Sequence, residues 1–508
     1  MGETVGGDKC PCLLSLLDRC YGKRHASEVQ PDETENGEAV RQPPSTPRLK
    51  PPPVPASKGE TPDRDMYTAL WTFHARAEEE LSFEMGDRFK ILSRTGEWWN
   101  AAKVTPNGQI VGTGFVPYNY LARGETAEAQ PWYFGKMNRL EAVNHLLSPE
   151  NGNGTFLVRL SEREHVDYVL SVKSDNKVKH FKILQNAEGL YCLNERNSFT
   201  TLMGLIDYYK THSFSIIEKL TEGCRRKEPK PQDLSHSTVD EWELPKEEFT
   251  LGKLLGTGYF ADVYEGLWKN QVRVAIKVLK NKENMNYREF QLETQILKKL
   301  RHKHLISLLA ICTTEDSYYI VTELMEKGNL LNFLRGTEGR RLDMTSLLDM
   351  ACQVADGMAH LESQKSIHRD LAARNVLVGD NLICKVADFG LARVTKEPFY
   401  ISEDKKIPYK WCAPEAISHG CFSTKSDVWS FGVLLYEILT YGGVPYPVYN
   451  NNEVYKLITS GYRMPCPENC PKSVYNIMLS CWRDSPEDRP PFPFLRQQLE
   501  KFNKYDMD

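Results

Sequence analysis

The chain has 508 residues, enough for three to four folded units at roughly 100 to 200 residues per domain. Hydrophobic residues make up 41% and charged residues 26%, ordinary globular values that exclude a wholly disordered, collagen-like or coiled-coil protein. With 64 Lys and Arg against 68 Asp and Glu, the net charge is −4, which excludes a bulk attraction to nucleic acid. Any recognition of anions must therefore be local.

Cysteine usage and the apolar segments predict where the protein works. The thirteen cysteines are odd in number and thinly spread, which is not typical of a disulfide framework and predicts a reducing compartment. The longest apolar stretch, Val428 to Leu439, is broken by Ser430 and Glu437 and is shorter than the roughly 20 residues of a membrane span. No secretory cleavage pattern follows the first apolar run. We expect a cytoplasmic protein, and nuclear access stays open.

The first 65 residues are expected to be disordered. From about residue 28 to residue 65 the chain is rich in Pro, Ser, Thr and charge and cannot offset its ordering entropy. Within it, Pro51 to Pro55 favours polyproline II and could serve as a ligand or as a rigid spacer. The start fits N-myristoylation of Gly2 poorly. Three cysteines beside leucines and basic residues could instead be palmitoylated, giving peripheral contact with the inner face of the plasma membrane: Cys10, Cys12 and Cys20.

Residues 66–124 predict a small antiparallel β-barrel, because short alternating runs are separated by turns. The runs Tyr67 to Phe73, Trp98-Trp99 and Gly114 to Tyr120 have the spacing of an SH3 domain, which the segment resembles over its whole length. The resemblance implies an aromatic groove for Pro-rich ligands, with Glu78 to Glu80 pairing a basic residue of the ligand. The groove residues would be Trp71, Phe73, Trp98, Phe115, Pro117 and Tyr120. The alternative is that these aromatics form the core of the barrel.

Residues 132–224 contain an arginine at the end of an apolar strand. Arg159 follows residues 155–158, where burial would be unfavourable without an anionic partner. The block resembles an SH2 domain, which implies a bidentate contact of Arg159 with phosphotyrosine; the alternative is a structural ion pair. The pocket would comprise Arg139, Arg159, Ser161, His180 and Lys182. Arg163 departs from this pattern, because many relatives carry a small hydroxyl residue there.

Residues 225–248 are predicted to link the SH2 domain to the next domain. The segment is polar and carries Pro229, Pro231 and the isolated Trp242. Two prolines make a poor free SH3 ligand, but a tethered ligand acts at high effective concentration. We expect this linker to bind the chain's own SH3 groove.

Residues 249–502 resemble a protein kinase domain, followed by a tail at 503–508. A glycine-rich segment lies between two expected strands, and Gly256 and Gly258 would let backbone amides approach phosphates. Ala261 replaces the third glycine of the family pattern and could restrict closure over ATP. The resemblance implies an ATP site formed by Leu255, Gly256, Thr257, Gly258, Tyr259, Phe260, Ala261, Asp262, Val263, Lys277, Thr322, Glu323 and Met325.

A lysine on a β-branched strand is the next motif. Lys277, in Val274-Ala275-Ile276-Lys277, would be unfavourable to bury unless it met anionic groups, so it should hold the α- and β-phosphates. Its protein partner would be Glu293 on an amphipathic helix. The alternative for Glu293 is an ordinary exposed carboxylate.

Two further motifs indicate phosphoryl transfer. In His368-Arg369-Asp370 through Asn375, and in Asp388-Phe389-Gly390, the resemblance implies that Asp370 accepts the proton of the attacking hydroxyl. Asn375 and Asp388 would hold Mg²⁺. Arg374, in Leu371-Ala372-Ala373-Arg374, stands in the pattern of tyrosine kinases, and Pro408 would pack against the phenol ring of the acceptor.

Control elements are also expected. Tyr400, before Ala413-Pro414-Glu415, would be autophosphorylated and pair with Arg369 and Arg393. Tyr505 would be phosphorylated and bound by Arg159, unless it is a plain surface tyrosine. Glu415 and Arg489 would form a structural ion pair, and Cys412, where Thr is more usual, only packs.

The order SH3, SH2, kinase resembles the Src-related cytoplasmic tyrosine kinases, and within them the Brk (breast tumour kinase), Frk and Srms branch. Segments such as Ile407 to Trp411 and Gly461 to Pro467 favour Brk. The fold would be multidomain α+β: an SH3 β-barrel, an SH2 sheet flanked by helices and a bilobal kinase. Its partners would be phosphotyrosine proteins, Pro-rich proteins and protein tyrosine substrates. One competing hypothesis is an adaptor with an inactive kinase fold, which Ala261 and Cys412 favour. Another is a membrane-recruited scaffold.

Overall fold

The computed structural model describes residues 66–502 with short gaps, and all of them belong to the compact unit Asp63–Asp508. The gaps are residues 125, 161–167, 195–196, 214–218, 230–232, 240, 259–260, 281–283, 315–316, 390–392, 395–399 and 402–407. Several predictions therefore lie outside the described residues: those on 1–65, Ser161, Arg163, Pro231, Tyr259, Phe260 and Tyr505. Tyr400 and Arg393 lie on short strands, but their side chains are not described.

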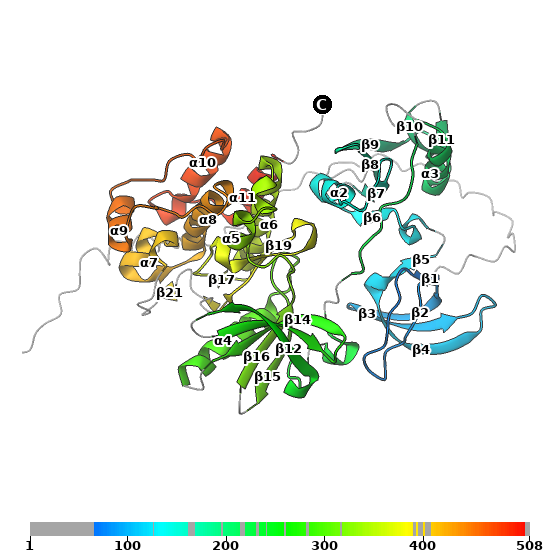
Figure 1. Cartoon of the computed structure of the whole chain (residues 1–508), viewed down its shortest axis with the longest axis horizontal. Helices are drawn as coiled ribbons and strands as arrows, with labels where there is room; N and C mark the ends of the chain where they lie inside the picture. Colours follow the sequence, from blue (N-terminus) through cyan, green and yellow to red (C-terminus); the bar gives the residue numbers. More distant parts are fainter. Residues whose placement is uncertain are drawn as a thin grey trace, which may run out of the picture. The chain divides into compact units, whose positions relative to one another are not determined.

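The SH3-like segment is an antiparallel sheet with strand order β4-β3-β2-β1-β5 (Figure 1). Its strands are β1 (Met66–Ala69), β2 (Arg88–Thr95), β3 (Trp98–Val104), β4 (Ile110–Pro117) and β5 (Leu121–Arg123). In β2 the side chains alternate, and Phe89 and Ile91 point into the core while their neighbours are exposed. The period of two thus gives this small domain one buried face.

The SH2-like segment is a sheet with strand order β11-β10-β9-β8-β7-β6, and helices α2 and α3 flank it (Figure 1). Its elements are β6 (Tyr133–Lys136), α2 (Arg139–Leu146), β7 (Phe156–Leu160), β8 (Tyr168–Ser174), β9 (Lys177–Gln185), β10 (Tyr191–Asn194), β11 (Asn197–Phe199) and α3 (Leu202–Thr211). Successive residues of β7 face opposite sides: Leu157 packs with Leu146 of α2, whereas Val158 packs with Leu205 of α3. The two helices therefore cover opposite faces of the sheet.

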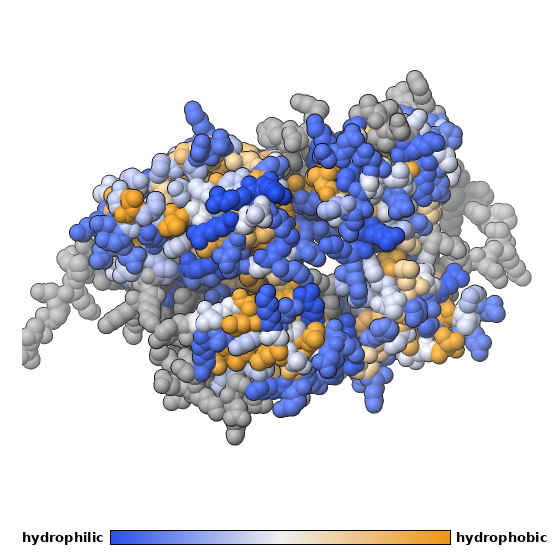
Figure 2. Space-filling model, viewed as in Figure 1, coloured by the Kyte–Doolittle hydropathy of each residue, from blue (hydrophilic) through white to orange (hydrophobic). Residues whose placement is uncertain are grey.

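The kinase-like segment begins with an antiparallel sheet of order β12-β13-β14-β16-β15 and one long helix. These elements are β12 (Phe249–Thr257), β13 (Ala261–Trp268), β14 (Val272–Leu279), α4 (Asn284–Lys299), β15 (Leu308–Thr314) and β16 (Ser317–Glu323). Figure 2 shows hydrophobic residues on the surface of this sheet, and Leu254 and Leu255 of β12 are about half exposed. At Gly266, a Cβ would lie 2.9 Å from the Thr250 carbonyl oxygen, so the close approach of β12 and β13 requires glycine here.

The second kinase lobe is mainly helical. Its helices are α5 (Leu330–Arg335), α6 (Met344–Ser363), α7 (Pro414–His419), α8 (Thr424–Leu439), α9 (Asn451–Thr459), α10 (Lys472–Cys481) and α11 (Phe492–Glu500). Short strands lie between them: β17 (Ser366–Ile367), β18 (Val376–Val378), β19 (Cys384–Val386), β20 (Arg393–Val394), β21 (Tyr400–Ile401) and β22 (Cys421–Phe422).

Polar caps and apolar faces explain the central helices of this lobe. Asp343 caps α6 by accepting from the Ser346 amide, and Ser423 forms a capping box with Ser426 at the start of α8. Both helices are buried along most of their length and form the main core. The predicted catalytic loop lies between β17 and β18. In the part of the chain described, no helix is long and apolar enough to span a membrane.

Candidate functional site

The glycine-rich segment forms the hairpin between β12 and β13. The Gly258 amide donates to the Ala261 carbonyl (2.8 Å), and Asp262 forms an ion pair with Lys280 (2.8 Å). Lys280 Nζ also donates to the Gly258 carbonyl (2.9 Å). Ala261 is the first residue of β13 and pairs with Leu279, an extended position that alanine adopts without strain. The replacement of the third glycine is therefore compatible with the hairpin.

Lys277 of β14 lies between two carboxylates. Its Nζ donates to both oxygens of Glu293 on α4 at 2.9 Å and lies 3.3 Å from Asp388 Oδ1, so the predicted ion pair is confirmed. Burial alone would lower the pKa of Lys277, but Glu293 and Asp388 together outweigh burial and raise it. The ammonium is therefore charged and positioned beside the residue predicted to bind metal.

The catalytic loop gathers the other predicted catalytic residues around one carboxylate. Asn375 Nδ2 donates to the carbonyl of Asp370 (2.7 Å) and to its Oδ2 (2.8 Å), and Arg374 Nη2 pairs with its Oδ1. Burial raises the pKa of Asp370, although Arg374 and His368 act in the opposite direction. The carboxylate is therefore oriented by two neighbours and is more basic than an exposed aspartate.

A buried aspartate of α8 fixes the backbone that carries this loop. Asp427 accepts from the amides of His368 (2.7 Å) and Arg369 (2.9 Å). Burial raises the pKa of Asp427 to about 6, against the opposing effects of His368 and Arg369. Arg369 has φ 71° and Asp388 has φ 60°, both in the left-handed region that disfavours side chains. The His368 ring bridges the two segments, because its Nε2 lies 3.1 Å from the Ala387 carbonyl.

The segment Pro408 to Trp411, where Pro408 is predicted to pack against the acceptor phenol, is called here the acceptor shelf; it lies beside the catalytic loop and shares a carboxylate with it. Glu437 of α8 is 1% exposed, and its Oε2 accepts from the Ala373 amide and from Trp411 Nε1, both at 2.9 Å. The guanidinium carbon of Arg374 lies 4.5 Å from the centre of the Trp411 ring. Pro408 precedes the turn Tyr409–Trp411 and is half-buried. The shelf is thus joined to the catalytic loop through Arg374 and Glu437.

The other predicted kinase residues have structural contacts. The Glu323 carboxylate accepts from Lys385 Nζ (2.6 Å) and the Ser307 amide (2.9 Å), and the Glu323 amide donates to the Ser307 carbonyl (3.2 Å). Glu323 ends β16, Thr322 precedes it in the strand, and Met325 follows in the core. The predicted ion pair between Glu415 and Arg489 is confirmed at 2.6 and 3.0 Å. Cys412 is 3% exposed and packs in the core.

The donor set fits ATP and a hard divalent cation. Asn375 uses Nδ2 for both of its hydrogen bonds to Asp370, so Oδ1 is the atom suited to a cation. Asp388 adds a carboxylate that is 54% exposed and lies beside the charged Lys277. Oxygen ligands and an ammonium in one place are suited to a magnesium-bound polyphosphate.

The predicted phosphotyrosine residues lie on the face of the SH2 sheet that α2 covers. Arg159 pairs with Val169, which pairs with Lys182, and opposed residues of an antiparallel sheet share a face. Arg159 is 6% exposed, and its Nη1 donates to the Met137 carbonyl (3.0 Å) just before α2. Arg139 is the first residue of α2.

The surroundings of His180 indicate that this pocket is positively charged. It lies on the same face, and its Nδ1 is 2.8 Å from Ser171 Oγ. Burial, and then the charges of Arg139 and Arg159, lower the pKa of His180 to about 3. The histidine is therefore neutral at pH 7 in a pocket whose two arginines suit a phosphate.

The predicted SH3 groove divides into core and contact residues. Phe73, at 3% exposed, packs against Phe83 and Trp98 in the core, where the alternative interpretation placed it. Trp98 and Pro117 are also buried, whereas Trp71 and Phe115 are half-buried. The Tyr120 hydroxyl donates to Glu228 Oε1 (2.6 Å) and lies 3.4 Å from the Pro229 carbonyl. The linker therefore occupies the Tyr120 end of the groove.

A second stretch of the linker contacts the acidic residues of the SH3-like domain. Glu80 is 6% exposed and accepts from Ser235 Oγ (2.5 Å) and the His236 amide (2.7 Å), and Glu79 Oε2 lies 3.8 Å from His236 Nδ1. The His236 ring stacks on Phe115 with centroids 3.4 Å apart. A hydroxyl and a backbone amide of the linker thus hold Glu80, and the pairing of Glu78 to Glu80 with a basic residue of a Pro-rich ligand stays a prediction.

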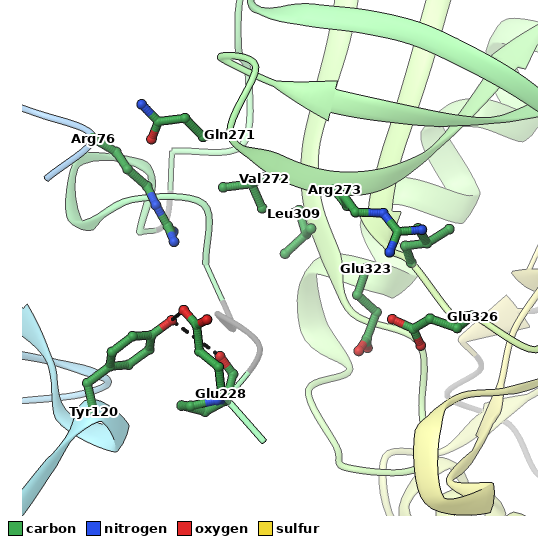
Figure 3. A pocket seen from close by; sticks show the side chains of 11 residues that line it. Arg76, Tyr120, Glu228, Gln271, Val272, Arg273, Leu309, Glu323 and Glu326 are labelled. Carbon is green, nitrogen blue, oxygen red and sulfur yellow. Dashed lines mark hydrogen bonds between the residues drawn. The ribbon is translucent and has the colours of Figure 1, made fainter. Parts of the chain in front are cut away.

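The linker also borders a cavity of about 300 Å³. Arg76, Tyr120 and Glu228 lie on one side, and Val272, Leu309 and Glu323 of the kinase-like segment lie on the other (Figure 3). In Figure 3 the Tyr120 hydroxyl points toward Glu228, with the hydrogen bond drawn between them.

Sequence reasoning missed several of these residues. Asp427 and Glu437 lie inside an apolar helix, and an acidic residue in such a helix is itself a signal of a buried hydrogen-bond acceptor. In the linker, Arg226 lies over the Trp71 ring at 5.5 Å, and Asp233 pairs with Arg301 at 3.1 Å. Nothing in the linker sequence distinguishes these two charges from solvated ones.

Comparisons with known proteins identify the same three domains. Residues 249–499 match the family described as "Protein tyrosine and serine/threonine kinase", residues 132–209 match the SH2 domain and residues 68–117 match the SH3 domain. A Homo sapiens relative named "Protein-tyrosine kinase 6" is 50% identical over 440 residues, covering 87% of this chain and 97% of the relative. A Mus musculus relative of the same name is 49% identical with the same coverage. The predicted fold class and the likeness to Brk, which is protein-tyrosine kinase 6, are confirmed.

Proposed function

The chain belongs to the protein-tyrosine kinases that combine SH3, SH2 and kinase domains, and it is a protein tyrosine kinase. From this premise we propose that Asp370, Arg374, Asn375, Asp388 and Lys277 perform phosphoryl transfer from ATP to tyrosines of signalling proteins. The observation that supports the assignment best is the grouping of Asn375 and Arg374 around the buried Asp370 carboxylate. Inactive adaptor function, the competing hypothesis, is set aside, because the enzyme class is shown by the relatives.

Each residue has a defined part in the proposed mechanism. Lys277, held charged by Glu293 and Asp388, binds the phosphates of the donor. Mg²⁺, when bound by Asn375 and Asp388, neutralises phosphate charge. Asp370 holds the acceptor hydroxyl and takes its proton, a task favoured by its raised pKa. Arg374 keeps the Asp370 carboxylate in place and packs on Trp411, which borders the acceptor shelf.

The test is transfer of labelled phosphate from MgATP to a Glu/Tyr copolymer by the purified protein. We expect transfer by the wild type and loss of roughly 10³-fold or more in Lys277→Met and Asp370→Asn, since each removes charge stabilisation or the base. Folded variants that keep wild-type rates would refute the assignment. Phosphopeptide mapping of the same reaction tests the proposed autophosphorylation at Tyr400.

We further propose that the SH3 and SH2 domains regulate the kinase by contacts within the chain. Tyr120 with Glu228, and Glu80 with Ser235 and His236, support a linker docked on the SH3 domain. The electropositive pocket around Arg159 supports phosphotyrosine binding, including phosphorylated Tyr505. Competing ligands would then release the kinase. Phosphotyrosine proteins and Pro-rich proteins are the partner classes that the two domains imply.

Two sets of variants test this regulation. Pro229→Ala with Pro231→Ala should raise basal activity by weakening linker docking, and Arg159→Lys should do so by losing the bidentate contact with phosphotyrosine. Arg159→Lys should be compared with the wild type in cells that phosphorylate Tyr505. Unchanged activity there would refute the SH2 contact, and unchanged activity of the proline variant would refute the SH3 contact.

We also propose that the protein is cytoplasmic and has peripheral contact with the inner face of the plasma membrane. Its support is the three cysteines beside leucines and basic residues in the first 24 residues of the sequence. Changing Cys10, Cys12 and Cys20 to Ser should abolish membrane association measured by cell fractionation. Association that persists in this variant would refute palmitoylation as the anchor.

A further inference from the structure

A short turn of the linker is docked on the acidic edge of the SH3 domain through one buried carboxylate. Ser235 is fully buried and begins the 3₁₀ turn His236–Thr238, and its Oγ donates to Glu80 Oε1 at 2.5 Å. The same oxygen accepts from the His236 amide at 2.7 Å, and Glu80 Oε2 accepts from the Arg76 amide at 2.7 Å. Glu80 therefore holds the linker with hydrogen bonds that water cannot easily replace.

One exposed hydroxyl lies next to this buried contact. Ser237 is exposed, and its Oγ is 3.0 Å from Ser235 Oγ. The other hydroxyls of the turn are inaccessible, since Ser235 is 0% exposed and Thr238 is 6% exposed with its Oγ1 donating to the Ser235 carbonyl (2.9 Å). While the linker is docked, Ser237 is the hydroxyl of this turn that an enzyme can reach.

We propose that Ser237 is a phosphorylation site for a Ser/Thr kinase that selects acidic residues after the acceptor, and that its phosphate releases the linker from the SH3 domain. This inference rests on the proposed SH3–linker regulation. In the step, Ser237 Oγ bonds to the γ-phosphorus of ATP and the bond to the ADP oxygen breaks. The hydroxyl proton passes to the base of that kinase. The selectivity follows from the sequence, since Asp240 and Glu241 stand three and four residues after Ser237 and suit a basic substrate groove.

Hydrogen bonding gives the first reason for release. A hydroxyl has one proton to donate, and Ser235 donates it to Glu80. A phosphate on Ser237 would carry about −1.5 to −2 charges and only acceptor oxygens beside Ser235, so it would compete with Glu80 for that proton. Either Glu80 or the phosphate would lose its partner, and the lost partner would have to be replaced by water.

The surrounding charges give the second reason. Glu79 and Glu80 flank the turn, with Glu79 3.8 Å from His236 Nδ1, and a phosphate would repel both carboxylates. Arg76, whose amide donates to Glu80, also contacts the linker, because its Nη1 donates to the Leu234 carbonyl at 2.9 Å. If Arg76 turned to the phosphate, it would give up this contact with the linker. Repulsion and rearrangement therefore both weaken docking.

The experiment compares Ser237→Asp with Ser237→Asn in the full chain, because the two side chains are nearly equal in size and differ in charge. We measure the initial rate on a tyrosine peptide and the affinity of a Pro-rich peptide for the SH3 domain. Ser237→Asp should raise both by about fivefold, from charge repulsion across a few ångströms, and Ser237→Asn should stay within about twofold of the wild type. In a Glu80→Gln background the difference between Asp and Asn should shrink. Thermal melting confirms that each variant is folded.

A second arm tests modification of Ser237 itself. The full chain carrying Lys277→Met, which cannot phosphorylate itself, is incubated with MgATP and an acid-directed Ser/Thr kinase. Mass spectrometry should place a phosphate on Ser237 and not on Ser235 or Thr238. Phosphate confined to other sites would overturn the proposal.

The proline variant separates failure of this proposal from failure of the regulation beneath it. If Pro229→Ala with Pro231→Ala activates but Ser237→Asp matches Ser237→Asn, the site at Ser237 is refuted and linker docking stands. If neither activates, linker docking is refuted and the proposal falls with it.

Discussion

Replacing Glu437 by glutamine tests whether one buried carboxylate joins the acceptor shelf to the catalytic loop. Its Oε2 accepts from the Ala373 amide and from Trp411 Nε1, each at 2.9 Å. Ala373 lies between the base Asp370 and the proposed metal ligand Asn375. Loss of either bond would therefore loosen the substrate shelf or the loop that carries the base. Glu437 touches no reacting atom, so it is a positioning residue.

The size of the effect follows from the type of hydrogen bond. A bond to a charged group contributes about 1.5–3 kcal/mol and a neutral one about 0.5–1.5 kcal/mol, so glutamine should lose about 1 kcal/mol per bond. Two bonds give about 2 kcal/mol, or roughly 30-fold if all of it is expressed in the transition state. Burial raises the pKa of Glu437, and Trp411 and Ala373 oppose that rise. A partly protonated wild type would make the loss smaller at acidic pH.

The assay is steady-state kinetics on a tyrosine peptide at saturating ATP. We expect Glu437→Gln to lower kcat/KM for the peptide by about 10- to 30-fold while KM for ATP changes less than about twofold. Tyr436→Phe, on the same helix, is the matched control. A loss of stability would lower the apparent kcat/KM by reducing the amount of folded enzyme and would leave KM unchanged, so active-site titration must accompany the rates. Wild-type peptide kinetics in Glu437→Gln would refute the reasoning.

Further predictions concern pH, the ion pair and packing. Because burial raises the pKa of Asp427 from 3.8 to about 6, the folded state holds this proton more tightly than the unfolded state. The free energy of unfolding should therefore fall by about 3 kcal/mol as the pH rises from 3.8 to about 6. Asp427→Asn should remove this pH dependence from the melting temperature, and the same pH dependence in both proteins would contradict the prediction. Glu293→Gln should lower kcat/KM for ATP about tenfold by leaving Lys277 with Asp388 alone, which ATP titration checks. Gly266→Ala should destabilise the protein by about 1–3 kcal/mol, a drop visible in thermal melting, since its Cβ would meet the Thr250 carbonyl; an unchanged melting temperature would refute this.

The residues around the phosphate donor could be predicted because their chemistry is visible in the sequence. A lysine in a β-branched strand needs an anion when it is buried, and the structure places Glu293 and Asp388 there. The register of the SH2 sheet could not be known in advance, yet the predicted cations fall on one face once β7, β8 and β9 pair. Residue types in the sequence thus indicated which side chains bind anions, and the pairing of the strands brings these side chains together on one face.

Acceptors of backbone hydrogen bonds were not predicted, because their partners carry no sequence signal. Asp427 and Glu437 bind amides of residues about 60 positions away, and any residue except proline offers such an amide. Long-range backbone contacts of this kind emerge only when the helix and the loop are both placed.

The SH3 groove shows a different limit. Aromatic residues were correctly gathered in one domain, but the sequence could not separate Phe73, which packs in the core, from Trp71, which meets the linker. The acidic residues were expected to pair with a basic residue of a ligand, and nothing in the sequence indicated that Glu80 also binds a hydroxyl and an amide of the chain's own linker. Because Ser237 lies 3.0 Å from the Ser235 hydroxyl that Glu80 binds, a phosphate on Ser237 would make this contact one that a second kinase could control.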